Sequence, residues 1–75
     1  MLRRPVTSSN VASVGWEPGE EGEDVGVLEV EFKSGHVYRY EGVPEREFEA
    51  LVGAGSVGRY LNAHIIGHYD ERAAG

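Results

Sequence analysis

The clearest pattern in the chain is an alternation of apolar and polar residues between positions 27 and 42, VLEVEFKSGHVYRYEG. Leu28, Val30 and Phe32 alternate with two glutamates, which is typical of a β-strand with one buried and one solvated face. Residues 33–35, Lys-Ser-Gly, have the composition of a turn, and a second alternating arm follows them. The pattern predicts a β-hairpin.

The length of the turn decides which side chains of the second arm share the buried face. A three-residue loop that ends with Gly35 in the left-handed region pairs Val30 with Tyr38 and Leu28 with Tyr40. A two-residue loop would move the second arm by one residue and separate the two apolar faces. We therefore expect the three-residue loop, with both tyrosines on the buried face.

The segments before the hairpin are less regular. Residues 9–16 show a weaker alternation that ends at Trp16, and they predict a first strand. Residues 17–25 contain five acidic residues among turn formers, which predicts a solvated acidic loop. Residues 1–6 are expected to be flexible because Pro5 discourages regular strand pairing.

Helical spacing replaces the alternation after Pro44. Phe48, Leu51 and Val52 stand at positions i, i+3 and i+4, which predicts one apolar stripe on a helix of about two turns. Pro44 suits the first helical position, and Gly53 suits a left-handed residue at the helix end. The pattern predicts a short helix between these two residues.

A second helix is expected after Ser56, which is a good N-cap residue. Its apolar side would include His64 and His68, and Gly67 could end it early. The tail 70–75 is expected to be flexible.

Strands first and helices last predict an α+β fold: a three-stranded antiparallel β-meander with two C-terminal α-helices packed on one face. The 75 residues are expected to form a single domain with a small core. The absence of cysteine fits a reducing compartment, and no stretch has the length of a membrane span. We expect a cytoplasmic protein without membrane contact, monomeric by default and without a cofactor.

The formal net charge of −6 argues against a broad basic surface for nucleic acid. Five of the acidic residues lie in the segment 17–24, so the rest of the chain is close to neutral. A local basic patch therefore remains open.

Catalytic groups are few in this sequence. No nucleophile stands beside a base, so we expect a protein that is not an enzyme. His64 and His68 have the spacing of two zinc ligands on a helix, but Ile65 occupies the place of a general-base glutamate and no third ligand is evident. We interpret the two histidines as packed between helix and sheet, and they stay weak candidates for a metal.

The stretch Gly55-Ser56-Val57-Gly58-Arg59 could bind an anion. A helix N-terminus offers free N–H groups, to which Ser56 would add a hydroxyl and Arg59 a cation. Gly58 would permit close approach of a ligand to the backbone. The alternative is an ordinary capped helix in which Gly58 packs against the first helix, and this alternative is favoured because no phosphate-loop spacing is present.

The triplet Tyr38-Arg39-Tyr40 could stack nucleobases, as aromatic residues on the sheets of RNA-binding domains do. The predicted register favours core tyrosines with hydroxyls at the rim, and it sets Arg39 on the solvated face opposite Glu29. Arg39 is then the better exposed contact for a ligand.

A set of residues spread over most of the chain is shared with a known family: Val6, Ser8-Ser9, Val14-Gly15, Leu28 to Phe32, Gly35, Tyr38-Arg39-Tyr40, Gly42-Val43-Pro44, Ala54, Ser56, Gly58, Tyr60, Asn62, Ile65 and Tyr69. In this order and spacing the chain resembles the KTSC domain. That family is named for its occurrence at the C-terminus of some lysyl-tRNA synthetases, and it also occurs as a free-standing bacterial or phage protein. The family has no established activity, and its attachment to a tRNA-charging enzyme implies RNA binding.

The leading hypothesis is a small non-catalytic binding module with nucleic acid, RNA in particular, as the candidate ligand. The candidate ligand-binding residues are Tyr38, Arg39, Tyr40, Ser56, Gly58, Arg59 and Asn62. The alternative is a protein–protein interaction or accessory domain that uses the acidic loop or the exposed face of the sheet.

Overall fold

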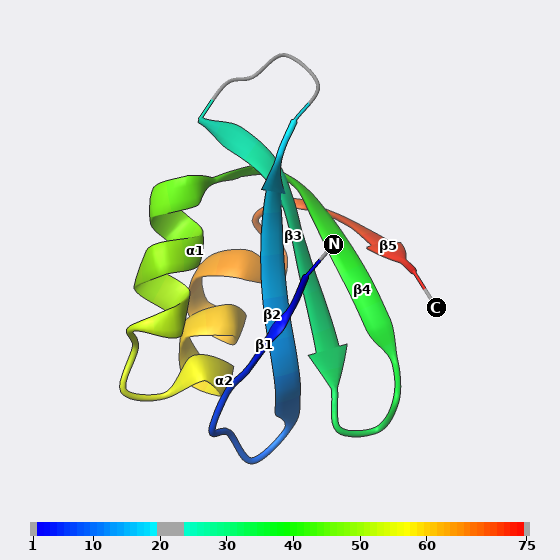
Figure 1. Ribbon diagram of the computed structural model, residues 1–75, viewed down its shortest axis with the longest axis vertical. Helices are drawn as coiled ribbons and strands as arrows, with labels where there is room; N and C mark the ends of the chain where they lie inside the picture. The colour runs from blue at the N-terminus through cyan, green and yellow to red at the C-terminus, as the bar shows by residue number, and fades with distance from the viewer. Residues whose placement is uncertain (1, 20–23, 75) are drawn as a thin grey trace.

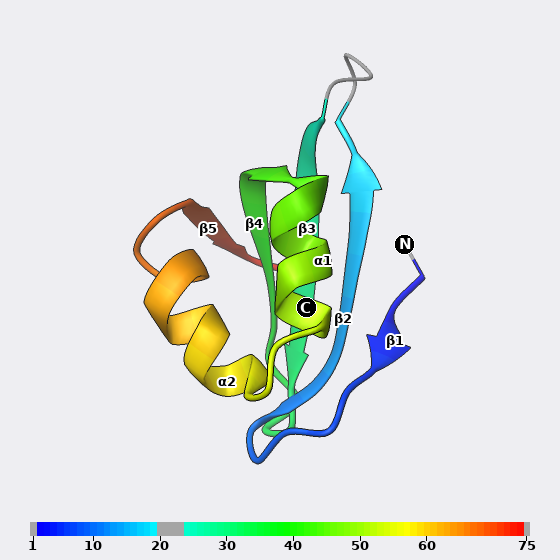
Figure 2. The same ribbon diagram turned by 90° about the vertical axis from the view of Figure 1, so that its left-hand side faces the viewer.

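A computed structural model describes residues 2–19 and 24–74 of the chain. A five-stranded antiparallel sheet, in which each strand lies beside its neighbours in sequence, carries all the helical segments on one face (Figures 1 and 2). The elements in chain order are β1 (Arg4–Pro5), β2 (Val11–Pro18), β3 (Val25–Phe32), β4 (Val37–Pro44), α1 (Glu45–Val52), α2 (Val57–Tyr60), the π-helical turn η1 (Leu61–Ile65) and β5 (Asp70–Ala73). The α+β class and the antiparallel sheet with two C-terminal helices are confirmed, but the predicted number of three strands is wrong.

The central hairpin has the register that parity predicts. Leu28 lies opposite Tyr40, and Val30 lies opposite Tyr38. Gly35 has a φ of +99°, and its N–H donates to the carbonyl of Phe32 at 2.9 Å. This left-handed glycine is what the three-residue loop requires, because a side chain at that φ would be strained.

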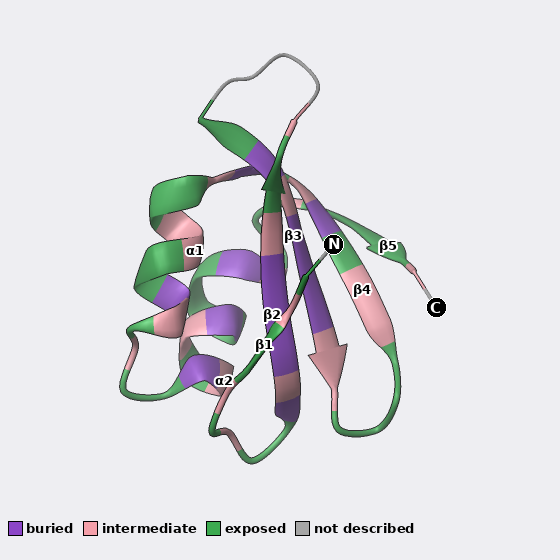
Figure 3. Cartoon of the chain, in the orientation of Figure 1, coloured by how far each residue is buried: buried purple, intermediate pink, exposed green. Residues whose placement is uncertain are grey.

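The core lies between the sheet and the helices (Figure 3). Leu28 and Val30 are fully buried, and Tyr40 is only 1% exposed. Tyr38 is half-buried, since it stands nearer the end of the sheet. The helices supply the opposite half of the core through Leu51, Val57, Leu61 and Ile65.

The weak alternation of β2 has a structural cause. The register between β2 and β3 shifts between Val11 and Ser13, as a β-bulge does. Val11 and Val14, three residues apart, are therefore both fully buried. The strand runs Val11–Pro18 rather than over residues 9–16.

Both segments predicted to be flexible contain edge strands. In β1, Arg4 lies opposite Val14 and Pro5 opposite Ser13, while β5 pairs with β4 along Asp70–Ala73. Proline is tolerated on an edge, where its missing N–H costs no ladder bond, and a short charged strand suits the other edge because it discourages pairing with further chains. Pro5 therefore does not prevent strand pairing at the first edge, contrary to the expectation from sequence.

The ends of the first helix differ from the predictions, whereas the second helix ends early, just before Gly67, as the sequence suggested. α1 begins after Pro44, which is its N-cap, and Gly53 has a right-handed conformation with φ −90° and ψ −2°. The second helix ends at Ile65, because Ile66 is extended with ψ 124° and Gly67 has a φ of +86°.

The predicted acidic loop lies partly outside the described residues, which omit 20–23. Of its remaining positions, Glu17 and Pro18 belong to β2 and Val25 begins β3. Over the described ranges, no helix is long and apolar enough to cross a membrane.

Candidate ligand site at the hairpin end

The structure separates the seven residues predicted to contact a ligand. Tyr40 is a core residue, and burial together with the Glu71 carboxylate raises the pKa of its hydroxyl above the usual range. Its ring cannot stack on a ligand without unfolding of the core. The interpretation of Tyr40 as a core tyrosine is confirmed.

Arg39 lies on the sheet face away from the helices, and its charge is engaged there. Its Nε lies 2.8 Å from Oε1 of Glu29, and this hydrogen bond raises the pKa of the guanidinium. Glu29 is only 7% exposed, and its second oxygen lies 3.2 Å from Nη1 of Arg3. The Glu29 carboxylate therefore partly neutralises the charges of Arg39 and Arg3, which could otherwise bind a phosphate.

The polar groups near the start of α2 are bonded within the chain. The Ser56 hydroxyl accepts from the N–H of Arg59 at 3.3 Å, which confirms the predicted N-cap. The Asn62 amide donates to the carbonyl of Gly58 at 3.2 Å. A Cβ at Gly58 would lie 2.8 Å from Oδ1 of Asn10, so this glycine allows close approach of the turn before β2 rather than of α1.

The two histidines do not form a metal pair. His64 is exposed, and its ring stacks on that of Tyr60 with a centroid distance of 4.3 Å. His68 is also exposed and lies beyond the end of η1, so the expected helical spacing is absent. Their predicted packing between helix and sheet was wrong. In the described part of the chain, no three histidine, cysteine or acidic side chains gather as metal ligands would.

Two tyrosines, Tyr60 at the end of α2 and Tyr69 just before β5, bind to α1. The hydroxyls of Tyr60 and Tyr69 both donate to the carboxylate of Glu47. The bond to Glu47 raises the pKa of Tyr60 to about 12, and burial with the same carboxylate raises the pKa of Tyr69. This cluster joins α1 to the end of α2 and to the segment before β5.

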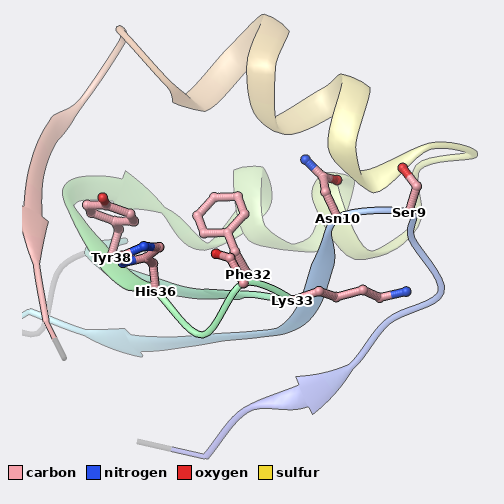
Figure 4. Close-up of a pocket in the computed structure, with 7 residues that line it drawn as sticks. Ser9, Asn10, Phe32, Lys33, His36 and Tyr38 are labelled. Carbon is pink, nitrogen blue, oxygen red and sulfur yellow. The ribbon is translucent and has the colours of Figure 1, made fainter.

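Tyr38 lines a pocket at the end of the hairpin (Figure 4). The pocket has a volume of about 460 Å³ and a mainly apolar surface. We call it the hairpin pocket, and it is lined by Ser9, Asn10, Phe32, Lys33, Ser34, His36 and Tyr38.

Three aromatic rings form one side of this pocket. The Phe32 and Tyr38 rings meet edge to face with centroids 5.9 Å apart, and the His36 and Tyr38 rings are 6.3 Å apart. Their closeness follows from the three-residue turn: the N–H of Phe32 donates to the carbonyl of His36 at 2.9 Å, so the two residues are paired across the hairpin. Tyr38, two residues along, then points to the same face.

The other side of the pocket comes from the turn before β2. The Ser8 hydroxyl accepts from the N–H of Val11 at 3.3 Å, which holds this turn in shape. The N–H of Lys33 donates to the carbonyl of Asn10 at 2.9 Å and ties the two turns together. In Figure 4 the Asn10 amide points toward the helical layer, and the Lys33 chain extends away from the rings.

The pocket stands where three carboxylate-free stretches of sequence meet. The ranges 2–16, 32–38 and 50–69 contain no aspartate or glutamate, although the whole chain has a net charge of −6. The turn before β2, the β3–β4 turn and the start of α2 lie at the same end of the molecule (Figure 1). We call this region the hairpin end; it carries Lys33 and Arg59.

Sequence reasoning included Tyr38 but missed its neighbours in the pocket. The predicted hairpin register already places Phe32, His36 and Tyr38 on one face at the end of the sheet, which was a usable signal. Asn10 had no such signal, since only the fold brings its turn beside the hairpin.

Comparisons with known proteins agree with this fold. The KTSC domain model matches residues 7–69. An uncharacterized protein of Stutzerimonas stutzeri is 44% identical over 62 residues, 83% of this chain and 80% of that protein. A protein of Tsukamurella paurometabola is 36% identical over 62 residues, 83% of this chain and 85% of that protein.

A solved structure has the same fold. The crystal structure of a KTSC domain protein from Yersinia pestis matches with a TM-score of 0.87 and 35% sequence identity, and the match covers 99% of this chain and 97% of that one. By sequence and by fold, this chain belongs to the KTSC domain family.

Proposed function

We propose that the protein is a small non-catalytic module that binds single-stranded nucleic acid, RNA in particular, by holding one unpaired base in the hairpin pocket. The observation that carries the proposal is a ring-lined cavity in a part of the chain that has cations and no carboxylates. An aromatic wall and a nearby positive charge are the two features that single-strand binding sites combine.

The rings supply the larger part of the contact. A base that stacks on an aromatic side chain gains about 1–3 kcal/mol, whatever its sequence, because each base has a π face. Tyr38 is half-buried, so its ring is held in place while part of it still faces the pocket. Phe32 meets it edge to face and forms the adjoining wall.

The polar groups of the pocket supply orientation. The Asn10 amide and the Ser9 hydroxyl can each donate to or accept from the edge of a base. Lys33 is exposed, and its side chain extends from the pocket away from the rings, where it can meet the phosphate that follows the base.

The shape favours an unpaired base. A volume of about 460 Å³ is at the scale of a small-molecule pocket, and a base inside a duplex would have to unpair and unstack to enter it, at a cost of a few kcal/mol. A single strand presents its bases without that cost.

The net negative charge does not oppose this location. Charges are largely screened beyond about 8–10 Å at physiological ionic strength, so a phosphate at the pocket responds to its near neighbours. No carboxylate lines the hairpin pocket, whereas Glu17 and Asp24 flank the β2–β3 connection at the opposite end of the sheet.

A direct test is the binding of a fluorescently labelled hexauridylate, measured by anisotropy at low salt and then at rising salt. We expect binding that weakens with salt, and weaker binding of a duplex of equal length. Lys33→Gln should weaken binding and reduce the salt slope by about 0.7, the contribution of one phosphate contact on a single strand.

The matched control is Arg72→Gln. Arg72 lies on β5 with its Nε 3.1 Å from Glu41, so its loss should leave binding unchanged. No binding of the hexauridylate at low salt would overturn the proposal.

A second candidate function is contact with a protein through the sheet face that no helix covers (Figure 2). The observation that favours it is the pairing of Arg3 and Arg39 with Glu29, which leaves a polar face with little free positive charge. Reversing the charge at Arg39 should weaken the binding of such a protein partner and leave the affinity for the oligonucleotide unchanged.

A further inference from the structure

We propose, building on the proposed function, that a second pocket beside β1 binds a phosphate group of the same strand whose base occupies the hairpin pocket. This second pocket, the β1 pocket, has a volume of about 450 Å³ and lies between the segment Arg4–Thr7 and the link from α1 to α2. Its surface is more polar than that of the hairpin pocket. No side chain that lines it carries a carboxylate.

Arg4 is the cation of this pocket. Its guanidinium carbon lies 5.7 Å from the centre of the Phe48 ring, an arrangement that holds the group by its face. The N–H groups lie around the edge of the guanidinium plane and stay available to an anion. Arg4 makes no ion pair with any residue that the structure describes, unlike Arg3, Arg39 and Arg72.

The backbone of the pocket adds donors that the chain does not use. Among residues 2–19 and 24–74, the amides of Thr7 and Gly55 make no hydrogen bond. A Cβ at Gly55 would meet nothing within 4 Å, so the backbone is open on that side. Unpaired amides that line the same pocket as an arginine are suitable donors for phosphate oxygens, and the Thr7 hydroxyl is a further one.

The two pockets are adjacent. Thr7 lines the β1 pocket and Ser9 lines the hairpin pocket. Two residues of extended chain span at most about 7 Å, so the pockets are separated only by the width of the turn around Ser8. Gly58 packs against this turn, and a Cβ added at this position would lie 2.8 Å from Oδ1 of Asn10 and 3.7 Å from Oγ of Ser8. A larger residue at this point would widen the separation.

The adjacent pockets give a bound oligonucleotide a path across the surface of the protein. A base in the hairpin pocket leaves its sugar–phosphate chain near Ser9, and the next phosphates can reach Arg4 without passing a carboxylate. Two linked contacts bind more tightly than either alone, because the second forms at the effective concentration set by the short link. The site should therefore prefer oligonucleotides to single nucleotides.

The test uses the hexauridylate with Arg4→Gln and with Arg72→Gln as the matched control. Removal of one phosphate contact should reduce the salt slope of binding by about 0.7 in Arg4→Gln and leave it unchanged in Arg72→Gln. Arg4→Gln should also bind uridine monophosphate and hexauridylate with more similar affinities than the unaltered protein does. An unchanged slope in a folded Arg4→Gln would overturn the inference.

A second measurement needs no variant. Isotopically labelled protein is titrated with hexauridylate and, separately, with inorganic phosphate, and the amide signals of Thr7, Gly55 and Tyr38 are followed. Shifts at all three with the oligonucleotide support the inference.

The other outcomes separate the two proposals. Shifts at Tyr38 alone overturn the β1 pocket and keep the proposed function. Shifts at Thr7 and Gly55 with phosphate, without any response to the oligonucleotide, overturn the proposed function and with it the inference that the β1 pocket binds a phosphate of a bound oligonucleotide. No shift with either ligand overturns both.

Discussion

Tyr38 and Tyr40 stand two residues apart on β4 and face the same side of the sheet, yet they belong to different regions of the molecule. Tyr40 lies under the helices, 1% exposed, with the Glu71 carboxylate beside its strand position. Tyr38 lies at the hairpin end, half-buried, with Phe32 and His36 as its ring neighbours. One tyrosine completes the core, and the other lines a pocket.

The difference shows that neither the net charge of the whole chain nor the alternation of residues along a strand describes the local surroundings of one residue. Of the net charge of −6, the segment 17–24 contributes −5, whereas the hairpin end carries no carboxylate. Parity places both rings on the covered face, but the distance from the end of the sheet decides whether the helices cover a ring completely.

The largest expected effect is on stability, where replacement of Tyr40 should cost much more than replacement of Tyr38. Tyr40→Ala should lower the free energy of unfolding by about 3–5 kcal/mol, the usual cost of removing a buried aromatic ring. A small domain has little stability to spare, so this variant should be largely unfolded at 37 °C. Urea unfolding followed by circular dichroism measures the loss.

Tyr38→Ala is the control for this experiment, and it should cost far less because its ring is partly exposed. Equal losses for the two variants would contradict the separation into core and pocket.

The next effect concerns the covered carboxylate on the other sheet face. Glu29→Gln should lower the free energy of unfolding by about 2 kcal/mol, because Arg39 and Arg3 lose a charged partner that is shielded from water. Glu41→Gln should cost at most about 1 kcal/mol, since the pair of Glu41 with Arg72 is exposed. Similar losses in the two variants would show that burial of Glu29 adds nothing to stability.

For ligand binding, in contrast to stability, Tyr38 should matter more than Tyr40. Tyr38→Ala should weaken hexauridylate binding about 5- to 150-fold, which corresponds to the loss of about 1–3 kcal/mol of stacking. Anisotropy titration at low salt measures it, with Tyr69→Phe as a control that keeps its ring and lies outside the pocket lining. Unchanged affinity in a folded Tyr38→Ala would place the ligand elsewhere.

A smaller effect tests a residue that the sequence proposed as a ligand contact. Ser56→Ala should lower the free energy of unfolding by about 1 kcal/mol, because the cap of α2 is lost. Its hydroxyl is engaged by the N–H of Arg59, so hexauridylate affinity should not change. A loss of affinity without a loss of stability would return Ser56 to the ligand site.

The smallest effect is a dependence on alkaline pH. The pKa of Tyr60 is raised to about 12 by the bond to Glu47, above a usual value near 10 for the unfolded chain. The folded state then holds the proton more tightly, so this stabilisation is present below pH 10 and is lost as pH rises from about 10 through 12.

Urea unfolding between pH 9 and about 11.5 should show this decline, and Tyr60→Phe should make it shallower. Tyr40 and Tyr69, whose pKa values are also raised, would retain the rest of the decline. An identical decline in Tyr60→Phe would mean that Tyr60 and Glu47 are not coupled.

Much of the fold could be predicted from sequence where neighbours in sequence are neighbours in space. The hairpin register followed from parity and from Gly35, and both were local. The edge strands could not be predicted, because Arg4–Pro5 and Asp70–Ala73 have no alternation of their own and pair only once the central sheet exists. The bulge at Val11 hid the pattern of β2 in the same way.

The site was less predictable than the fold. Parity favoured Tyr38 as a core residue and set Arg39 on the solvated face as the better contact, but Tyr38 lines the pocket and the Arg39 side chain is bonded to Glu29. Asn62, also expected to contact a ligand, is bonded to the Gly58 carbonyl. The pocket needs two turns that are more than twenty residues apart, and the bond from Lys33 to Asn10 that joins them exists only in the folded chain.

The most direct test of a base site at the hairpin end is a map of amide chemical shifts as hexauridylate is added to isotopically labelled protein at low salt. We predict the largest shifts at residues 8–10 and 32–38, fading as salt is raised. Glu17, Asp24 and Glu45, at the opposite end of the sheet, should not move. Shifts centred on those three residues, or none at all at high oligonucleotide concentration, would contradict the account.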